Sequence, residues 1–381
     1  MKKSYTSSVN IPDLPLWEKT KKKRSLLSFD IELTARCSFN CRHCYINVPS
    51  GDNKAIGKEL SAKEISRIAD EAVQLGALWC LLTGGEPLLR KDFSEIYISL
   101  KKKGLLVSVF THAALITDQH IHLFKKYPPR DIEVTVYGAT KETFEKVTRK
   151  PGSFKAFQKG LNLLLDNRIK VRLKAMALKS NLAELPKIAE FCRNMTKDYF
   201  RFDPFLHLRF DRDSAKNKEI KTERLAPGEI AELERSDSER FDSLKKECGR
   251  LVSNEFKNTA HHYLFSCGAG VSSFTLGYDG FFRLCSSLYH PDCMYDLRKG
   301  TLKQAWDQFV PLVRNLNSNK KAFVENCRVC PIVNLCMWCP AHSYLEKGAM
   351  DEPVDYFCRA AHQRHSSIKN TLTNEKNRNN L

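Results

Sequence analysis

Ten of the 14 cysteines fall into two spaced groups, and thiols at such spacings are typical of metal sites. The first group is Cys37-x3-Cys41-x2-Cys44, which directly follows the apolar segment 29–34. Three thiolates on one loop suit an iron–sulfur cluster. Because three ligands on a four-iron cluster leave one iron open, a ligand from outside could bind there. A structural zinc knuckle is the alternative.

The second group occupies the last third of the chain. Its members are Cys267, Cys285, Cys327, Cys330, Cys336, Cys339 and Cys358. Paired Cys-x2-Cys segments also hold zinc, so the spacing alone leaves iron and zinc open. Cys80 and Cys192 lie on the apolar stripes of an expected strand and an expected helix, and we interpret them as small core residues.

The elements that must position the first group alternate between strand and helix. The expected strands are 29–34, 78–83, 105–111, 132–137, 171–177 and 199–205, and the expected helices are 61–75, 92–103, 117–127, 153–167 and 182–195. Ser61 with Glu64 predicts a capping box, and Asp92 with Glu95 predicts a second cap. Such alternation predicts a parallel sheet with helices outside and chemistry at the C-terminal ends of the strands.

Over about 28–208 the sequence resembles the radical S-adenosylmethionine (SAM) superfamily. The signature is C-x3-C-x2-C after the first strand of a partial barrel. Gly84-Gly85-Glu86-Pro87, after the second strand, is similar to the segment that contacts the SAM amino group. Glycines let the backbone approach a ligand, and the Glu86 carboxylate could accept a hydrogen bond from an ammonium.

The resemblance implies further SAM contacts. His43 would line the adenine, and Thr135 would lie near the ribose or the carboxylate. Lys174 would pair with the SAM carboxylate, and Asn181 would bond SAM as well. Ordinary core or strand-end packing is the alternative for each. Residues 111–113 read Thr-His-Ala where many relatives have Thr-Asn-Gly, which puts the ribose contact there in question.

The second cysteine group resembles a SPASM domain, which holds two auxiliary iron–sulfur clusters, over about 265–362. The resemblance implies an outer cluster on Cys327, Cys330, Cys336 and Cys358, and an inner one on Cys267, Cys285 and Cys339. The last Cys-x2-Cys is one residue shorter than the usual spacing. No thiol follows Cys267 closely, so the inner cluster would keep an open position unless Cys293 fills it.

The predicted fold class is α/β, a partial (β/α)6 TIM-like barrel followed by a small cysteine-rich, loop-rich SPASM domain. The expected parts are a basic N-terminal tail (1–27), the barrel (28–210), a charged helical linker (211–264), the SPASM domain (265–362) and a polar C-terminal tail (363–381). Residues after about 366 are expected to lack fixed structure.

The length and the net charge of the 381-residue chain limit the classes of partner that it is expected to bind. Its formal net charge is +18, partly from basic runs at 19–24 and 101–103, whose plain interpretation is solvated tails or helix ends. No RNA-binding module is recognisable, so a nucleic-acid partner is not expected. The chain has neither an 18-residue apolar run nor the apolar core of a signal peptide. We therefore expect no membrane partner and a cytoplasmic protein, whose cysteines stay reduced.

The function implied by the resemblance is reductive cleavage of SAM to a 5′-deoxyadenosyl radical, which takes hydrogen from a substrate. A ribosomally made precursor peptide is favoured, with thioether or carbon–carbon links as products. An electron donor such as flavodoxin or ferredoxin is implied. Only about 28 residues precede the first strand, so a peptide-recognition module would be absent or a separate protein.

Several alternatives stay open. They are a tetrapyrrole or other small-cofactor enzyme, a sulfatase maturase, an RNA-modifying enzyme and a non-catalytic iron–sulfur protein. Sulfatase maturases place an Asp directly after the inner cysteine, whereas Ser286 follows Cys285 here.

Overall fold

The computed structural model of the chain describes residues 24–196, 201–251 and 263–379. The expected tail 1–27 therefore lies almost entirely outside the described residues. The first two residues of the expected strand 199–205 and the end of the expected linker 211–264 also fall outside them.

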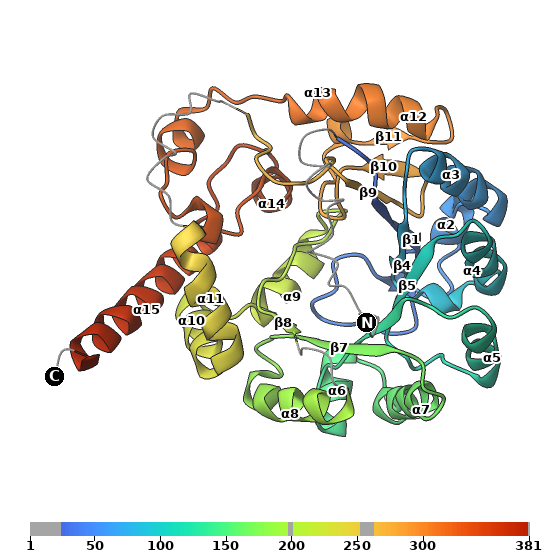
Figure 1. Ribbon diagram of the computed structural model, residues 1–381, viewed down its shortest axis with the longest axis horizontal. Helices are drawn as coiled ribbons and strands as arrows, with labels where there is room; N and C mark the ends of the chain where they lie inside the picture. The colour runs from blue at the N-terminus through green and yellow to red at the C-terminus, as the bar shows by residue number, and fades with distance from the viewer. Residues whose placement is uncertain (1–23, 197–200, 252–262, 380–381) are drawn as a thin grey trace, which may run out of the picture.

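A parallel sheet curved into a partial barrel forms the first half of the molecule (Figure 1). Its strands, in spatial order, are β1 (Ser28–Thr34), β4 (Trp79–Gly84), β5 (Leu106–Thr111), β6 (Asp131–Thr135), β7 (Val171–Met176) and β8 (Arg201–Asp203). Each pairs in parallel with the next. This confirms the predicted order of strands.

Helices cover the outer side of the sheet (Figure 1). They are α3 (Ala62–Gln74), α4 (Phe93–Lys102), α5 (Asp118–Lys126), α6 (Lys141–Thr148), α7 (Ser153–Asp166) and α8 (Leu185–Met195). The strand β1 shows why they pack there, because Phe29, Ile31 and Leu33 are buried in the core against them. The alternate residues Asp30 and Glu32 face the barrel interior instead.

Two helix starts test the cap predictions. The predicted capping box at Ser61 is confirmed, since its Oγ accepts from Glu64 N and its own N–H donates to the Glu64 carboxylate at 2.8 Å. The predicted cap at Asp92 is wrong. Asp92 stands at the N-cap of α4 but makes no cap bond, because its carboxylate pairs with Arg90 at 2.6 and 2.8 Å. Such charge-assisted paired bonds are stronger than a cap bond.

Sequence periodicity missed several short elements. The helix α6 begins after Thr140, whose hydroxyl accepts from Thr143 N. The cysteine loop adds β2 (Arg36–Cys37), β3 (Val48–Pro49) and α2 (Asn53–Lys58). Too few turns or residues are present in these elements for a clear apolar period.

The last third of the chain continues the barrel sheet. The strand β9 (Ser273–Leu276) pairs in parallel with β1, and β10 (Phe281–Arg283) and β11 (Tyr295–Asp296) follow as antiparallel strands. Short helices α12 (Leu302–Gln304), α13 (Val310–Arg314) and α14 (Pro340–Lys347) complete this region. The cysteine-rich part is thus joined to the barrel by backbone hydrogen bonds along β1.

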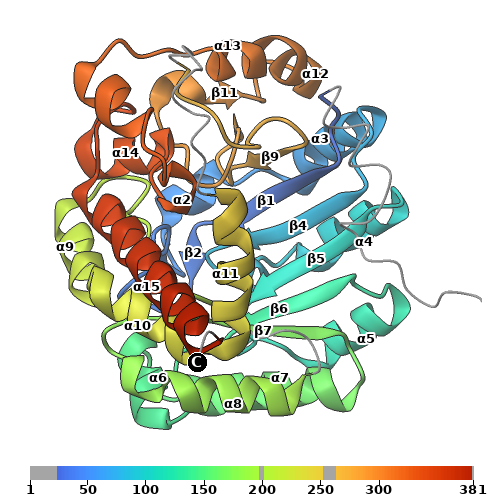
Figure 2. The ribbon, with the colours of Figure 1, turned by 60° about the vertical axis from the view of Figure 1, so that its left-hand side comes forward.

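Four helices form a separate layer that Figure 2 shows in front of the sheet. They are α9 (Ser214–Glu223), α10 (Pro227–Ser236), α11 (Ser238–Leu251) and α15 (Asp355–Asn379). The expectation that residues after about 366 lack fixed structure is wrong, because α15 continues through them. Arg364 bonds the buried Glu234 of α10 at 2.8 Å, and Ile368 is buried, so the polar end is held by packing.

A buried ion pair links the barrel to the cysteine-rich part. Glu32 of β1 and Arg283 of β10 are 1% and 2% exposed and are bonded to each other. The Tyr289 hydroxyl donates to the same carboxylate at 3.2 Å, and its ring lies 3.8 Å from the Arg283 guanidinium carbon. Burial raises the pKa of Glu32, and the charge of Arg283 opposes that rise.

We predict that Glu32→Gln lowers the free energy of unfolding by about 3–5 kcal/mol, because it leaves the Arg283 charge buried without its counter-ion. Urea unfolding of the purified protein measures this. Glu64→Gln, which changes a partly exposed carboxylate, is the control and should cost much less. Equal midpoints for the two variants would show that the buried pair does not join the two parts.

Candidate active site

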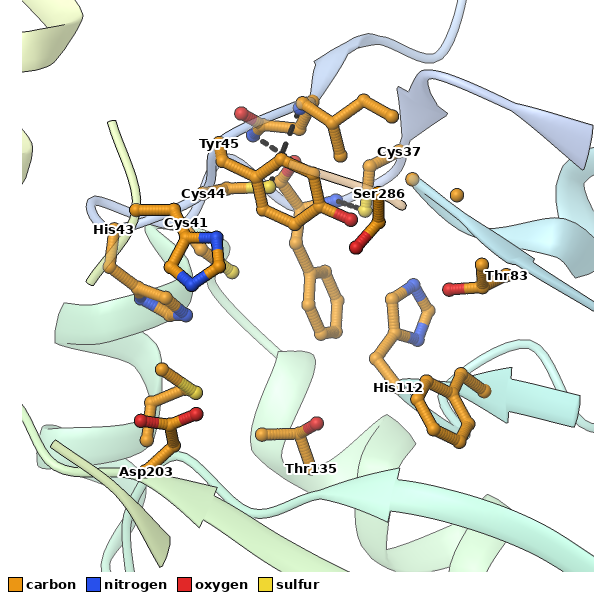
Figure 3. Close-up of a pocket in the computed structure, with 18 of the residues that line it drawn as sticks. Cys37, Cys41, His43, Cys44, Tyr45, Thr83, His112, Thr135, Asp203 and Ser286 are labelled. Carbon is orange, nitrogen blue, oxygen red and sulfur yellow. Dashed lines mark hydrogen bonds between the residues drawn. The ribbon is translucent and has the colours of Figure 1, made fainter. Parts of the chain in front are cut away.

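A cavity of about 390 Å³ opens at the C-terminal ends of the barrel strands. Its lining comes from the cysteine loop, from the strands β1 and β4 to β8 or the residues after them, and from Ser286 of the cysteine-rich part. Figure 3 shows Cys37, Cys41 and Cys44 on one side of this cavity, with Thr135 and Asp203 across from them. The predicted position of the site at the strand ends is confirmed.

The three loop cysteines have the chemistry that a cluster needs. None is in a disulfide, and all three line the cavity. Burial, and then the charges of Cys44 and Cys37, raise the pKa of Cys41. Backbone N–H groups already point at two sulfurs, from Phe39 to Cys37 and from Asn47 to Cys44, each at 3.4 Å.

Within the described residues, no three His, Cys, Asp or Glu side chains lie close enough together to hold one metal ion. In a four-iron cluster each thiolate binds a different iron, so the ligands stand farther apart than around a single ion. The cluster on Cys37, Cys41 and Cys44 stays a prediction.

Arg209 fixes the shape of the cysteine loop. Its guanidinium donates to the Asn47 carbonyl at 3.0 Å and to the Asp211 carboxylate at 2.7 and 3.0 Å. The Asn47 side chain in turn donates to the Phe39 carbonyl at 3.3 Å. Sequence reasoning missed Arg209, because it lies far along the chain in a segment without a motif.

Gly84 and Gly85 line the cavity and have no room for a side chain. A Cβ on Gly84, whose φ is +129°, would lie 2.2 Å from the Thr34 carbonyl oxygen. A Cβ on Gly85 would lie 2.2 Å from the Arg36 carbonyl oxygen. Backbone is thus packed directly against backbone beside the cysteine loop, as the predicted ligand approach requires.

Glu86 does not line the cavity. It is fully buried, and its carboxylate accepts from Thr111 Oγ1 at 2.8 Å, His112 N at 2.9 Å and Leu88 N at 3.1 Å. Glu86 follows β4, and its hydrogen bonds with Thr111 and His112 connect it to the end of β5. Its predicted contact with the SAM ammonium stays a prediction. His112 lines the cavity next to it and bonds Ser38 at 3.0 Å.

Three other predicted SAM contacts lie on the cavity. His43 is buried with an unpartnered Nδ1, and burial lowers its pKa to about 4, so it presents a neutral ring. Thr135 lies at the end of β6. Lys174 is ion-paired with Glu133 and lies 3.7 Å from the centre of the Phe110 ring. A SAM carboxylate would have to compete with Glu133 for it.

Asn181 lies outside the cavity lining. Its side chain accepts from Leu178 N at 2.9 Å and donates to the carbonyls of Tyr137 and Met176 at 3.1 and 3.0 Å. All of these bonds are to backbone, so Asn181 shapes the turn after β7. Its predicted bond to SAM stays a prediction.

The cysteines of the second group gather as two sets. Burial, and then the charges of Cys339 and Cys267, raise the pKa of Cys285 to about 11. Burial, and then the charges of Cys358, Cys327 and Cys330, raise the pKa of Cys336 to about 12. These mutual influences have the membership expected from the sequence, and the two clusters themselves stay a prediction. Cys80 and Cys192 are both 1% exposed, as predicted for core residues.

Sequence reasoning also missed part of the cavity wall. Asp30, Tyr45, Asp203, His207 and Ser286 line the cavity, and none was singled out as a SAM or substrate contact. Only Asp30 carries a local signal, since it is one of two acidic residues on the inward face of a strand whose other face is apolar.

Comparisons with known proteins agree with this geometry. Residues 31–192 match the profile of the Radical SAM superfamily. The chain is 30% identical to AdoMet-dependent heme synthase of Methanosarcina barkeri (strain Fusaro / DSM 804) over 43% of its own length and 46% of the relative. It is 25% identical to antilisterial bacteriocin subtilosin biosynthesis protein AlbA of Bacillus subtilis (strain 168), over 81% of this chain and 66% of the relative. The chain thus matches about half to two thirds of these relatives' lengths.

The fold of the chain as a whole is similar to that of solved structures. Streptococcus suis SuiB bound to the precursor peptide SuiA superposes with a TM-score of 0.66, at 16% identity, over 93% of this chain and 83% of that one. No helix in the described part of the chain is long and apolar enough to cross a bilayer. Residues 31–192, which include the cysteine loop at the end of the first barrel strand, match the Radical SAM superfamily, and the chain as a whole is similar in fold to SuiB.

Proposed function

We propose that this chain is a radical SAM enzyme that modifies a ribosomally made peptide. The observation that carries the proposal is the shared cavity. Cys37, Cys41 and Cys44 line it together with Gly84 and Gly85, and the same cavity reaches Ser286 beside Cys285. A SAM site and an auxiliary-cluster site would therefore face one substrate.

The residues of the cavity divide the work of binding. Cys37, Cys41 and Cys44 would hold a four-iron cluster, which supplies the electron that cleaves bound SAM. Gly84 and Gly85 present backbone to the ligand, and the neutral ring of His43 offers an apolar face to the adenine. The protein's task is to orient SAM and exclude side reactions.

The two cysteine sets of the last third would hold auxiliary clusters. Cys327, Cys330, Cys336 and Cys358 supply four thiolates, and Cys267, Cys285 and Cys339 supply three. Their mutual electrostatic influence supports this division. Cys293 is fully buried with its Sγ 3.7 Å from Met350 Sδ. Burial raises its pKa and the charge of Cys285 contributes to the rise, so Cys293 lies near the inner set. We propose that its contact with Met350 keeps it from acting as the fourth ligand and leaves that position open.

Coverage favours a peptide over a small cofactor as substrate. The match to AlbA spans 81% of this chain, whereas the match to heme synthase spans 43%. The SuiB structure with a bound precursor peptide shares the fold over both parts. A tetrapyrrole or other small-cofactor reaction is the second candidate, because the heme synthase is the more identical of the two relatives.

The proposal implies partners and a compartment. A flavodoxin or ferredoxin would supply electrons, and a separate protein could recognise the peptide. Reduced free cysteines suit the cytoplasm.

The proposed substrate is tested by first searching the reading frames beside this gene for small cysteine-containing peptides and then assaying those peptides. Anaerobic protein, SAM and reductant should convert one of them to a product that lacks two hydrogens per link, as seen by mass spectrometry. Conversion of a porphyrin but of no peptide would favour the second candidate instead.

The first cluster is tested by changing Cys37, Cys41 and Cys44 together to Ala. The wild type should form 5′-deoxyadenosine and hold about 12 iron atoms, and the variant should form none and keep about eight. Iron analysis and chromatography measure this. Undiminished 5′-deoxyadenosine in the variant would overturn the assignment, and about two zinc ions in the variant would overturn the auxiliary clusters.

Gly85→Ala should weaken SAM binding at least ~10-fold, or ~1.4 kcal/mol, because the added Cβ collides with the Arg36 carbonyl beside the cysteine loop. Calorimetric titration of the reconstituted protein measures this. The matched control is Gly57→Ala, where nothing lies within 4 Å, and which should bind SAM as the wild type does. An unchanged affinity in Gly85→Ala would remove this segment from the SAM site.

Cys293→Ser tests the open position of the inner set. The variant should keep its iron, and a cysteine peptide should still perturb the electron paramagnetic resonance spectrum of the inner cluster. Loss or conversion of that cluster in the variant, with no perturbation by peptide in the wild type, would make Cys293 the fourth ligand.

A further inference from the structure

The inside of the barrel holds a second cavity beneath the active site. It has a volume of about 290 Å³ and is lined by residues from the N-terminal ends of the strands, among them Ser28, Ser108 and Arg172. Most of the side chains that line it are polar. This cavity therefore suits water more than apolar packing.

A single layer of side chains separates the two cavities. Asp30, Leu81 and Phe110 line both of them. Lys174 faces the upper cavity and Glu133 the lower one, and these two are ion-paired. The floor of the active site is thus two apolar side chains, one ion pair and the carboxyl group of Asp30.

Asp30 differs from the other acidic groups on the inward face of the sheet. Glu32 is held by Arg283 and Tyr289, and Glu133 by Lys174. Among the described residues, the Asp30 carboxyl has no hydrogen bond or ion pair. A half-buried carboxyl without a partner, between two cavities, is free to gain and lose a proton.

We propose that Asp30 is the acid–base residue of the active site and that it exchanges its proton with solvent through the second cavity. This rests on the proposed function for the identity of the reaction, but the position of Asp30 between the cavities does not. The residue that follows the inner cysteine Cys285 is Ser286 and not an acidic residue. At that position the C-terminal part therefore offers no carboxylate that could act as the acid–base residue.

The surroundings of Asp30 support the role. Burial, and then the charge of Glu32, raise the pKa of Asp30 to about 6. The carboxylate is thus a stronger base than an ordinary one and is still ionised at neutral pH. The charge of Asp30 also acts on Tyr45 of the cysteine loop and on Cys80 of β4. The other charged groups that line the cavities on either side of it are Arg130, Asp131, Glu133, Arg172, Lys174, Arg201 and Asp203.

Thioether formation releases one proton, which a base must accept. In thioether formation a C–H and an S–H bond break and a C–S bond forms. The hydrogen atom of the C–H bond would go to the 5′-deoxyadenosyl radical, and an oxidised iron–sulfur cluster held by Cys267, Cys285 and Cys339 would supply the acceptor for one electron. The remaining proton of the thiol goes to Asp30 and leaves through the second cavity.

The titration is tested without any substrate, on the reconstituted protein with SAM bound over the upper cavity. Infrared difference spectra should show a carboxyl that protonates near pH 6 in the wild type. The signal should be absent in Asp30→Asn and present in Asp131→Asn, which removes a carboxyl from the lower cavity only. A wild type without that signal would overturn the proposal.

The route is tested by filling the second cavity with Ser108→Leu. After transfer to D2O below pH 6, exchange of the Asp30 carboxyl proton should slow by about 10-fold or more, while its titration stays near 6. Ser108→Val is a smaller filler if the leucine variant is unstable. Unchanged exchange in a folded variant would overturn the route.

Catalysis gives the last readout. With a peptide that the wild type converts, Asp30→Asn should lower linked product roughly 100-fold or more, with cleavage of SAM retained. Product formation by the wild type should rise as the pH rises through about 6, because the base must be ionised. Equal product in Asp30→Asn would overturn the proposal. If the wild type converts no peptide, the proposed function fails, and the titration and exchange still decide the role of Asp30.

Discussion

The pairing of Glu32 with Arg283 is the constraint on which the rest of the structure depends. Removing two charges from water is costly, and the cost is recovered only when their geometry satisfies both. Here the carboxylate bonds the guanidinium and the Tyr289 hydroxyl, all inside the protein. Any shift of the cysteine-rich part relative to β1 would leave one of these charges buried alone. The two parts are therefore held in one register.

That register places the two kinds of cysteine site relative to each other. Arg283 ends β10, and Cys285 follows two residues later. On the other side, Glu32 lies on β1, whose end leads into the cysteine loop at Cys37. One ion pair thus fixes both the loop that would hold the SAM cluster and the segment that brings Ser286 to the cavity.

The sequence predicts best the features that depend on local order. The strand sequence, the capping box at Ser61 and the cysteine loop follow from neighbouring residues, and the structure confirms their positions. Features set by side-chain partners outside the motif were out of reach. The Glu86 carboxylate accepts hydrogen bonds from the end of β5, and Asp92 pairs with Arg90 instead of capping its helix. The helical end of the chain likewise depends on Glu234, about 130 residues earlier.

Charged side chains inside the barrel lower the stability of the fold unless they are paired. A buried charge is costly unless it is paired, and the inward faces of the strands carry several. Glu32 and Glu133 have partners that offset this cost. Asp30 has none among the described residues, and a valine there would pack against Leu81 and Phe110 at no such cost. Departures of this kind from good packing are expected at functional positions. The unpaired carboxyl lies where the active-site cavity meets the polar cavity beneath it, which is where proton exchange would need it.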